Sequence, residues 1–561
     1  MEGTEPRVRT RARGRARGKH AAARRTGPVR RTLLRPAVLM AAGTVVSRAT
    51  GLIRQVLQAG ALGTGLLATT YNQANTVPAS LYFLIIGGAL NSVLVPQLVR
   101  ARLEQPDGGR AFEQRLVTLT LTVLATGSLL AVWGAPQIIG VYQRDTPDNH
   151  AAFELTVVFA RFLLPQIFFY GMYGILGQVL NARHRFGAMM WTPVLNNVLL
   201  IGVFGWYTGV MTAAGGVRGI TPAQVTLLGA GTTLALAVQA LALVPFVHAA
   251  GFRFRPRFDW RGTGMRASIG AARWTLLFVL ANLVTATVVT RYATAADREL
   301  PRAGAGFTAY TYAQTIWSLP QSVVTVTLVT ALLPRMSRAA AEHRGDDLRR
   351  DLSHALRTSG AVTVPAAFFF LALGPQLAQL LFAHGAADAA ATRPLGWMLQ
   401  AFGPGLIPFS AQYVLLRGFY AFGDTRTPFL TALWTGAVQI VLATGCHLLL
   451  PARSAVTGMA ASYGIAYAVG LLVSARLLRR RLGGRLDGRR VARSYGKLTG
   501  AALMAAAAGW TAAALCPAPP GPAAGAAALA LAVGGAAMLP LFLLLARVGR
   551  TGELRGLPGM R

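Results

Sequence analysis

The sequence predicts an all-α polytopic membrane protein. Three observations support this fold class: 53% of the 561 residues are hydrophobic, only 13% are charged, and the mean hydropathy is +0.45. A typical soluble domain carries about 25% charged residues. The apolar residues also fall in long runs, such as 116–139 and 501–515. Together these features exclude a soluble enzyme, a disordered chain and a disulfide scaffold.

The apolar runs divide the chain into fourteen predicted membrane helices, because a bilayer core of ~30 Å needs about 20 apolar residues per helix. The predicted spans are roughly 34–61, 66–98, 116–142, 153–180, 187–208, 223–249, 268–292, 306–334, 357–381, 392–417, 428–450, 454–475, 495–516 and 523–546. The segments between them are too short for a soluble domain. The function is therefore expected inside the bilayer.

The basic residues predict the orientation of these helices, because cytoplasmic loops are enriched in Lys and Arg. With the N-terminus inside, 45 of the 55 basic residues fall in the predicted inner segments, and three fall within spans. The other seven lie in outer segments or at helix ends: Arg144, Arg218, Arg291, Arg298, Arg302, Arg393 and Arg453. We therefore predict that both termini are cytoplasmic.

The net charge of +36 indicates an anionic partner. Residues 1–35 alone hold 12 Lys and Arg residues, and the remaining basic residues lie mostly between apolar runs. A nucleic-acid-binding protein gathers its basic residues on a folded soluble face, which this chain lacks. We expect the basic segments to attract anionic membrane lipids and expect no nucleic-acid partner.

An internal repeat is visible in the first and second halves of the chain. The segment from Tyr71 to Pro78 resembles the segment from Tyr310 to Pro320, at an offset of 239 residues. The Thr-Pro pair at 192–193 recurs at 427–428, at an offset of 235 residues. Parallel repeats of this kind are a transporter architecture, with the substrate site between the lobes. The alternative is that Pro-containing apolar helices resemble each other by composition alone.

The repeat predicts the domain organisation. We expect a basic cytoplasmic tail (1–33), an N-lobe of spans 1–6 (34–249) and a C-lobe of spans 7–12 (250–481), then spans 13–14 (482–548) and a short cytoplasmic tail (549–561).

The sequence lacks the usual catalytic and metal-binding patterns. Its eight histidines show no HExxH spacing, Cys446 and Cys516 form no CxxC pair, and no GxxxxGK[ST] phosphate loop is present. Glu154 lies at a span edge, and we assign the other acidic residues to loops or tails. The sequence therefore predicts no enzyme activity, no metal site and no cofactor.

Basic residues inside the spans are the strongest candidates for a binding site. Arg48 and Arg54 flank Gly51 on the first span, in the pattern Ser47-Arg48-x-x-Gly51-x-x-Arg54. A charge near the bilayer centre costs about 2.5–3.5 kcal/mol even on the most lenient scale, so it usually faces a cavity or a partner. An arginine fork suits phosphate oxygens, and Gly51 would allow a ligand to approach the backbone. Ser47, next to Arg48, and Arg161 in span 4 are further candidates for contacts with substrate. The alternative is that the arginine side chains snorkel towards the interface.

Neutral polar residues mark two further spans. Span 2 carries Asn72, Gln73, Asn75, Thr76 and Asn91, and span 8 carries Gln314, Thr315, Ser318 and Gln321. Such residues often only hold helices together, for about 0.6 kcal/mol each. Their similar placement in both repeats favours a polar central cavity, in which we expect Asn72, Asn75 and Gln314 to contact substrate.

From about residue 35 to 480 the chain resembles the MurJ/MviN family. The motifs that carry the resemblance are Ser47-Arg48-x-x-Gly51-x-x-Arg54, Tyr71-Asn72-x-Ala74-Asn75-x-x-Pro78, Gly87-Gly88-Ala89-Leu90 through Val95-Pro96, and Leu415-Leu-Arg-Gly-Phe-Tyr-Ala421-Phe-Gly-Asp-Thr-Arg-Thr-Pro428. The Asn-x-Ala-Asn and Gly-Gly variants resemble the branch of this family in high-G+C Gram-positive bacteria.

The resemblance implies a member of the MATE-like exporter superfamily with two lobes around a cationic cavity. It implies that the protein flips lipid II, the undecaprenyl-pyrophosphate-linked peptidoglycan precursor, from the inner to the outer leaflet of the bacterial plasma membrane. Arg48 and Arg54 match the two first-helix arginines of the family, which the resemblance assigns to the pyrophosphate. Cell-wall synthesis proteins are the implied protein partners.

Several charged positions of the family are neutral here. The acidic residue expected before Tyr71 is Thr69, and the arginine pair after the span 2 proline is Tyr82-Phe83. The acid that follows is replaced by Gly87, the usual Asp-Arg dipeptide of span 8 by Gln314-Thr315, and a further acid by Ser318. The alternatives to lipid II flipping are export of another polyprenyl-linked glycan or a drug, and a non-transporting scaffold for cell-wall enzymes.

Overall fold

The structure is a computed structural model that describes residues 29–84, 106–183, 185, 187–210, 216–259, 265–484, 486–517 and 523–549. The expectations for most of the basic N-terminal tail, for the C-terminal tail after 549, and for Gly87 and Asn91 lie outside the described residues. The described part of the chain is helical and contains no strand.

The helices follow one another in the order α1 (Val29–Leu62), α2 (Leu66–Tyr82), α4 (Arg110–Trp133), α5 (Ala135–Tyr142), η3 (Pro147–Asn149), α6 (His150–Leu163), α7 (Gln166–Asn181), α8 (Gly187–Val210), η4 (Gly216–Arg218), α9 (Pro222–Leu241), α10 (Val244–Ala249), α11 (Met265–Glu299), α12 (Phe307–Pro320), η5 (Gln321–Thr325), α13 (Val326–Ala341), α14 (Gly345–Phe382), α15 (Ala389–Phe402), η6 (Gly403–Gly405), α16 (Leu406–Ala421), α17 (Arg426–Leu449), α18 (Ala452–Arg481), α19 (Gly488–Ala514) and α20 (Ala523–Val548).

The all-α membrane fold predicted from the apolar runs is confirmed. Ten helical stretches of the described chain are long and apolar enough to cross a bilayer. The four remaining predicted spans correspond to α1, α2, the α15–α16 pair and α19. Several spans are broken into two helices near a proline; at Pro320, for example, α12 passes into the single π-helical turn η5 before α13 begins. A π-helical turn is a common cause of a local bend.

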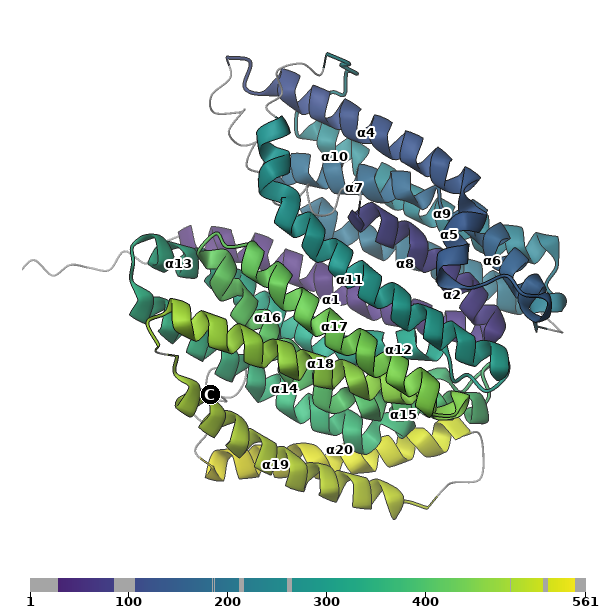
Figure 1. The fold of residues 1–561 in the computed structure, drawn as a ribbon, viewed down its shortest axis with the longest axis vertical. Coiled ribbons are helices and arrows are strands. Elements are labelled where there is room, and N and C mark those ends of the chain that lie inside the picture. The colour runs from purple at the N-terminus through teal and green to yellow at the C-terminus, as the bar shows by residue number, and fades with distance from the viewer. Residues whose placement is uncertain are drawn as a thin grey trace, which may run out of the picture.

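The same packing pattern occurs in both halves of the chain. In the N-terminal half (α1–α10), α1 packs on α8, and α8 packs on α9. In the C-terminal half (α11–α18), α11 packs on α17, and α17 packs on α18. Figure 1 shows α4–α10 gathered in the upper part of the view and α12–α18 below, with α11 running diagonally between them. The last two helices, α19 and α20, pack on each other and on α14 at the lower edge.

Loops that the sequence assigns to the same side of the membrane touch one another. On the predicted inner side, Gln114 at the start of α4 donates to the Arg253 carbonyl, and Arg349 pairs with Asp487 across 3.5 Å. On the predicted outer side, the backbone N–H of Leu66 donates to the Pro301 carbonyl at 3.1 Å. This grouping agrees with the alternation of the predicted spans, while the assignment of one side to the cytoplasm stays a prediction.

The orientation can be tested with single cysteines at Thr263 and Gly488, placed in a background in which Cys446 and Cys516 are replaced by alanine. Because 45 of 55 basic residues fall on the predicted inner side, we expect both cysteines to resist a membrane-impermeant thiol reagent in intact cells and to react after permeabilisation. A cysteine at Thr146, between α5 and α6, is the positive control. Rapid labelling at Thr263 or Gly488 in intact cells would contradict the orientation.

The Gly-Asp-Thr-Arg-Thr-Pro segment joins α16 to α17 in a tight turn. Gly423 has a φ of +70°, and the backbone N–H of Asp424 returns to the Phe419 carbonyl to close the end of α16. Glycine adopts this left-handed backbone conformation with little steric penalty. The Asp424 carboxylate then accepts from the Thr427 backbone N–H and hydroxyl. Burial alone would raise the pKa of Asp424, but these hydrogen bonds and the ion pair with Arg481 lower it overall. The segment is therefore built to turn the chain.

A buried ion pair holds the predicted inner end of the N-terminal half. Arg183, after α7, donates through both terminal nitrogens to the two oxygens of Glu113 on α4, at 2.6 and 3.1 Å. The side chains are only 9% and 1% exposed, and the guanidinium also lies 5.5 Å from the ring centre of Phe252. Such bidentate geometry is the strong form of an Arg–carboxylate contact.

Removing one partner of this pair is expected to destabilise the protein strongly. In Arg183→Met, the Glu113 carboxylate loses its guanidinium partner in a buried position, which typically costs about 3–5 kcal/mol in the free energy of unfolding. Glu113→Leu with Arg183→Met removes both charges and should recover most of that loss. Thermal unfolding of the purified protein in detergent measures both effects. A single variant as stable as the wild type would show that the pair does not contribute.

The sequence-based assignment of the acidic residues to loops and tails is wrong for several acids that lie within helices, such as Glu113 in α4, Asp351 in α14 and Asp297 in α11. The predicted seventh span ends at 292, whereas α11 continues to Glu299 and includes Asp297. The Asp297 side chain is fully buried. Arg291 interrupts the apolar run, so hydropathy alone ended the span too early, although the helix continues into the contact between the two halves.

Candidate functional site

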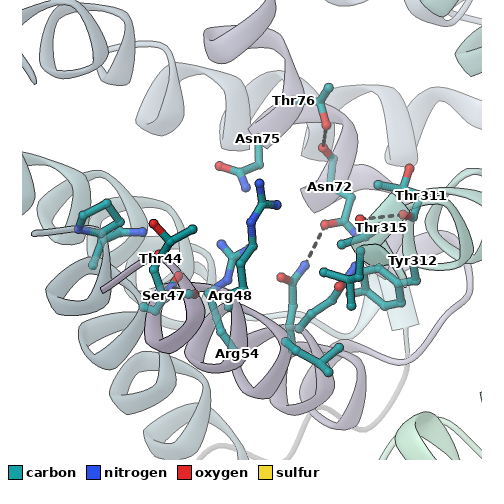
Figure 2. Close-up of a pocket in the computed structure, with 18 of the residues that line it drawn as sticks. Thr44, Ser47, Arg48, Arg54, Asn72, Asn75, Thr76, Thr311, Tyr312 and Thr315 are labelled. Atoms are coloured by element: carbon teal, nitrogen blue, oxygen red, sulfur yellow. Dashed lines mark hydrogen bonds between the residues drawn. The ribbon is translucent and has the colours of Figure 1, made fainter. Parts of the chain in front are cut away.

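A cavity of about 550 Å³ lies between the two halves of the chain. Helices α1, α2, α7, α8 and α12 supply its walls. Six of the eight predicted site residues line this central cavity together: Ser47, Arg48, Gly51, Arg54, Asn72 and Asn75. Figure 2 shows Arg48 and Arg54 on one side, Thr311, Tyr312 and Thr315 from α12 on the other, and Asn72 and Asn75 between them.

The cavity is cationic. Arg48 and Arg54 both line it, and no acidic side chain belongs to its described lining. Arg48 is exposed to the cavity, and Arg54 is half-buried with a buried Nε that has no hydrogen-bond partner in the described part of the chain. A guanidinium in a bilayer-embedded space gains most from an anionic ligand or water. The arrangement is therefore suited to a ligand that carries phosphate groups.

Contacts with α8 hold the arginine-bearing part of α1 in place. The Asn197 amide donates to the Ser47 carbonyl at 3.0 Å and to the Thr50 hydroxyl at 3.1 Å. A Cβ built on Gly51 would meet this amide at 3.5 Å, which is an ordinary contact distance. Gly51 thus lies beside a polar side chain of α8. The Gly51 backbone, which the sequence predicts a ligand can approach, is part of the cavity wall. The Asn197 side chain occupies part of the space next to it.

A chain of hydrogen bonds crosses between the two halves at one end of the cavity. The Gln58 amide donates to the Asn72 carbonyl oxygen at 2.6 Å, and the Asn72 amide donates to the Thr308 hydroxyl at 3.1 Å. Thr308 lies 2.9 Å from Thr69, whose own hydroxyl donates to the Asp297 carboxylate at 2.5 Å. Because the Thr69 proton is directed at Asp297, Thr308 must donate to Thr69. Hydrogen bonds aligned in one direction strengthen one another.

Asp297 also fixes the start of α12, because the same carboxylate oxygen accepts from the Phe307 backbone N–H at 2.9 Å. Gly306 leaves room for this contact, since a Cβ there would lie only 2.0 Å from the carboxyl carbon. Thr69, where the resemblance predicts an acid, therefore serves as the hydrogen-bond donor to an acid supplied by α11. Sequence reasoning missed Asp297; its signal was a lone Asp just beyond an apolar run.

Contacts to backbone carbonyls close the same end of the cavity. The Ala386 N–H donates to the Gly60 carbonyl at 2.8 Å, and the His384 ring contacts the Val56 carbonyl at 3.1 Å. The loop before α2 and the loop before α12 approach each other so closely that a Cβ on Gly65 would lie 2.3 Å from the Pro301 carbonyl oxygen. We call these contacts, together with the Gln58–Asp297 hydrogen-bond chain, the outer seal. The predicted orientation places the outer seal on the side away from the cytoplasm.

Two sequence-predicted site residues lie elsewhere. Gln314 lines a second cavity inside the C-terminal half, where its side chain interacts with the Tyr463 hydroxyl. Arg161 is exposed near the end of α6 and does not belong to the described lining of the central cavity. The sequence reasoning also missed Asn196 and Asn197 on α8 and Gln55 and Gln58 on α1, although polar pairs within an apolar span were a readable signal.

The fold and the site define a class: a multi-pass membrane transporter whose cationic cavity lies between two similarly packed groups of helices. The sequence profile of the family described as "Lipid II flippase MurJ" matches residues 58–519. This chain belongs to the MurJ family.

Individual relatives and solved structures agree with this assignment. A protein of Rhizobium meliloti (strain 1021) named "Probable lipid II flippase MurJ" is 28% identical over 419 residues, covering 73% of this chain and 75% of the relative. One of Synechocystis sp. with the same name is 26% identical and covers 86% and 88%. The structure "Lipid II flippase MurJ, inward closed conformation" has a TM-score of 0.71 at 17% identity, covering 91% of this chain and 99% of that one. An inward-facing multidrug MATE transporter gives a TM-score of 0.62 at 15% identity, with 78% and 94% covered.

Proposed function

We propose that this protein flips lipid II from the inner to the outer leaflet of a bacterial plasma membrane by alternating access. The observation that carries the proposal is the cationic central cavity, in which Arg48 and Arg54 are the only charged side chains of the described lining. The family match supports lipid II as the substrate. In this proposal the pyrophosphate binds between the two arginines, and the polyprenyl tail stays in the lipid.

The two groups of helices supply the transport cycle in this proposal. With the outer seal closed, the head group enters from the cytoplasmic side and binds at Arg48 and Arg54. The helices then rock, the outer seal opens, and the head group leaves towards the outer leaflet. The basic inner segments raise the local concentration of anionic lipid. The protein acts as a transporter and performs no chemical conversion of its substrate.

Cavity charge separates this function from its alternatives. A cationic drug would be repelled by two arginines in a low-dielectric space, and a scaffold for cell-wall enzymes would have no use for them. Cell-wall synthesis proteins remain proposed partners of the transporter. The domain boundaries at 249 and 481 and the cytoplasmic position of both termini are part of the same proposal.

The function is tested by reconstituting the purified protein in vesicles with lipid II placed in one leaflet. We expect the protein to increase the rate at which lipid II becomes accessible to an impermeant probe on the other side. Vesicles without protein and vesicles containing heat-denatured protein provide the background. Equal rates with and without native protein would reject flipping, and transport of a cationic dye without transport of lipid II would favour drug export.

A further inference from the structure

A second cavity, of about 360 Å³, lies within the C-terminal half and is built from α11, α12, α16, α17 and α18. It adjoins the central cavity at Thr76 of α2 and Thr311 of α12, which line both spaces. Its volume falls within the range of ~300–1,000 Å³ that is common for ligand pockets. We call this space the side pocket.

The side pocket differs from the central cavity in charge. Its described lining contains no Asp, Glu, Lys, Arg or His. The polar groups are amides and hydroxyls, contributed among others by Asn282, Gln314, Gln412 and Gln439. Burying an unpaired charge in such a space is costly, whereas a neutral hydroxyl or amide that finds a hydrogen bond costs little. The lining therefore fits an uncharged, polar ligand.

Two buried glutamines are held in fixed positions at the wall. The Gln439 amide nitrogen donates to the Ser462 hydroxyl at 3.2 Å, and the Gln412 amide nitrogen donates to the Thr435 hydroxyl at 3.4 Å. Each side chain is 3% exposed. The side-chain carbonyl oxygens of both glutamines have no hydrogen-bond partner among the described residues. Buried acceptors of this kind are usually satisfied, so a donor from a ligand or a water is expected there.

Glycines make room for these amides. A Cβ on Gly470 would lie 2.2 Å from the Thr435 hydroxyl and 2.6 Å from the Gln412 amide nitrogen. On the opposite helix, a Cβ on Gly436 would lie 2.5 Å from the Thr285 hydroxyl. The helices thus pack closely around the polar groups of the wall, which keeps the amides and hydroxyls at fixed places.

Aromatic rings form another wall of the side pocket. Tyr463 and Tyr467 stand one helical turn apart on α18, with ring centres 4.7 Å apart and hydroxyls 3.3 Å apart. Phe409 packs edge-on against Tyr467 at 4.9 Å and fixes its ring from behind. A tyrosine wall offers an apolar face and a polar edge at once. A sugar ring, which has an apolar face and hydroxyls at its edge, matches both features.

We propose that the side pocket binds the uncharged glycan part of the lipid II head group while the pyrophosphate lies between Arg48 and Arg54. This inference rests on the proposed function, because it assigns a further part of the same substrate to a second subsite. Thr76 and Thr311 line both spaces, so the two cavities adjoin, and the proposal places one ligand across both. The side pocket would thus distinguish the finished precursor from its bare carrier, which carries the same charges without the glycan.

The test compares the binding of two ligands to the full-length protein in nanodiscs: lipid II and bare undecaprenyl pyrophosphate. We expect the wild type to bind lipid II at least tenfold more tightly. Gln439→Leu and Tyr467→Leu should reduce the affinity for lipid II about tenfold and leave the affinity for the bare carrier unchanged. The retained affinity for the carrier also shows that the variants are folded. Gln400→Leu on α15, whose amide donates to the Leu371 carbonyl outside both cavities, is the matched control and should bind both ligands as the wild type does.

The outcomes separate this inference from the proposed function. If the wild type binds neither ligand, the proposed function fails. If it binds both, but Gln439→Leu and Tyr467→Leu keep the full preference for lipid II, the proposed function stands and the side-pocket inference is wrong. An equal loss for both ligands in the two variants would also overturn it, because the side pocket would then act on the carrier or on folding.

Discussion

Replacing Arg48 by alanine is expected to abolish flipping while the protein still inserts and accumulates in the membrane. Arg48 is exposed to the central cavity, which has no acidic side chain in its described lining, and in the proposed mechanism its guanidinium binds the pyrophosphate. A hydrogen bond to a charged group typically contributes about 1.5–3 kcal/mol, which corresponds to roughly a 10–150-fold loss of affinity. Loss of a bidentate contact lies at the upper end.

The measurement is complementation of a strain depleted of its own flippase, together with the vesicle assay. Arg48→Lys should recover only part of the activity, because an ammonium keeps the charge and lacks the planar fork. Arg161→Ala is the matched control: it removes an exposed arginine of α6 that does not line the described cavity, and we expect normal transport. Full complementation by Arg48→Ala would refute the assignment of the binding site.

The membrane fold could be predicted from the sequence because the bilayer sets the length of each apolar run. The helix ends were less predictable. Arg291 interrupts the apolar run that forms α11, yet the helix continues to Glu299, and Asp297 in its last turns accepts hydrogen bonds from Thr69 of α2 and from the Phe307 backbone of α12. Thr69 is 228 residues away from Asp297 in the sequence, so hydropathy alone gives no sign of this contact.

The direction in which a side chain points was the other limit. Gln314 and Thr315 are adjacent on α12 and therefore lie about 100° apart around the helix. Thr315 lines the central cavity and Gln314 the side pocket, while Thr311, one turn before Thr315, lines both. Arg161 shows the same limit on α6. A helix that is apolar on every side gives no amphipathic stripe, so the sequence does not reveal which face meets lipid and which meets protein.

Locking the outer seal with a disulfide is expected to stop transport completely and reversibly. The hydroxyls of Thr69 and Thr308 are 2.9 Å apart and belong to opposite halves of the chain, so cysteines at the two positions lie within reach of a disulfide. If transport requires the outer seal to open, a covalent bond between α2 and α12 must hold the protein in the closed state shown here.

The experiment uses Thr69→Cys with Thr308→Cys in a background lacking Cys446 and Cys516, reconstituted in vesicles. After mild oxidation we expect flipping to fall to the background rate, and a reductant should restore the rate that the double variant showed before oxidation. The two single-cysteine variants, treated identically, control for loss of the hydroxyls and for damage by the oxidant. If the oxidised double variant, with its disulfide verified by mass spectrometry, still flips lipid II at the reduced rate, the outer seal does not open during transport and alternating access through this end of the cavity is wrong.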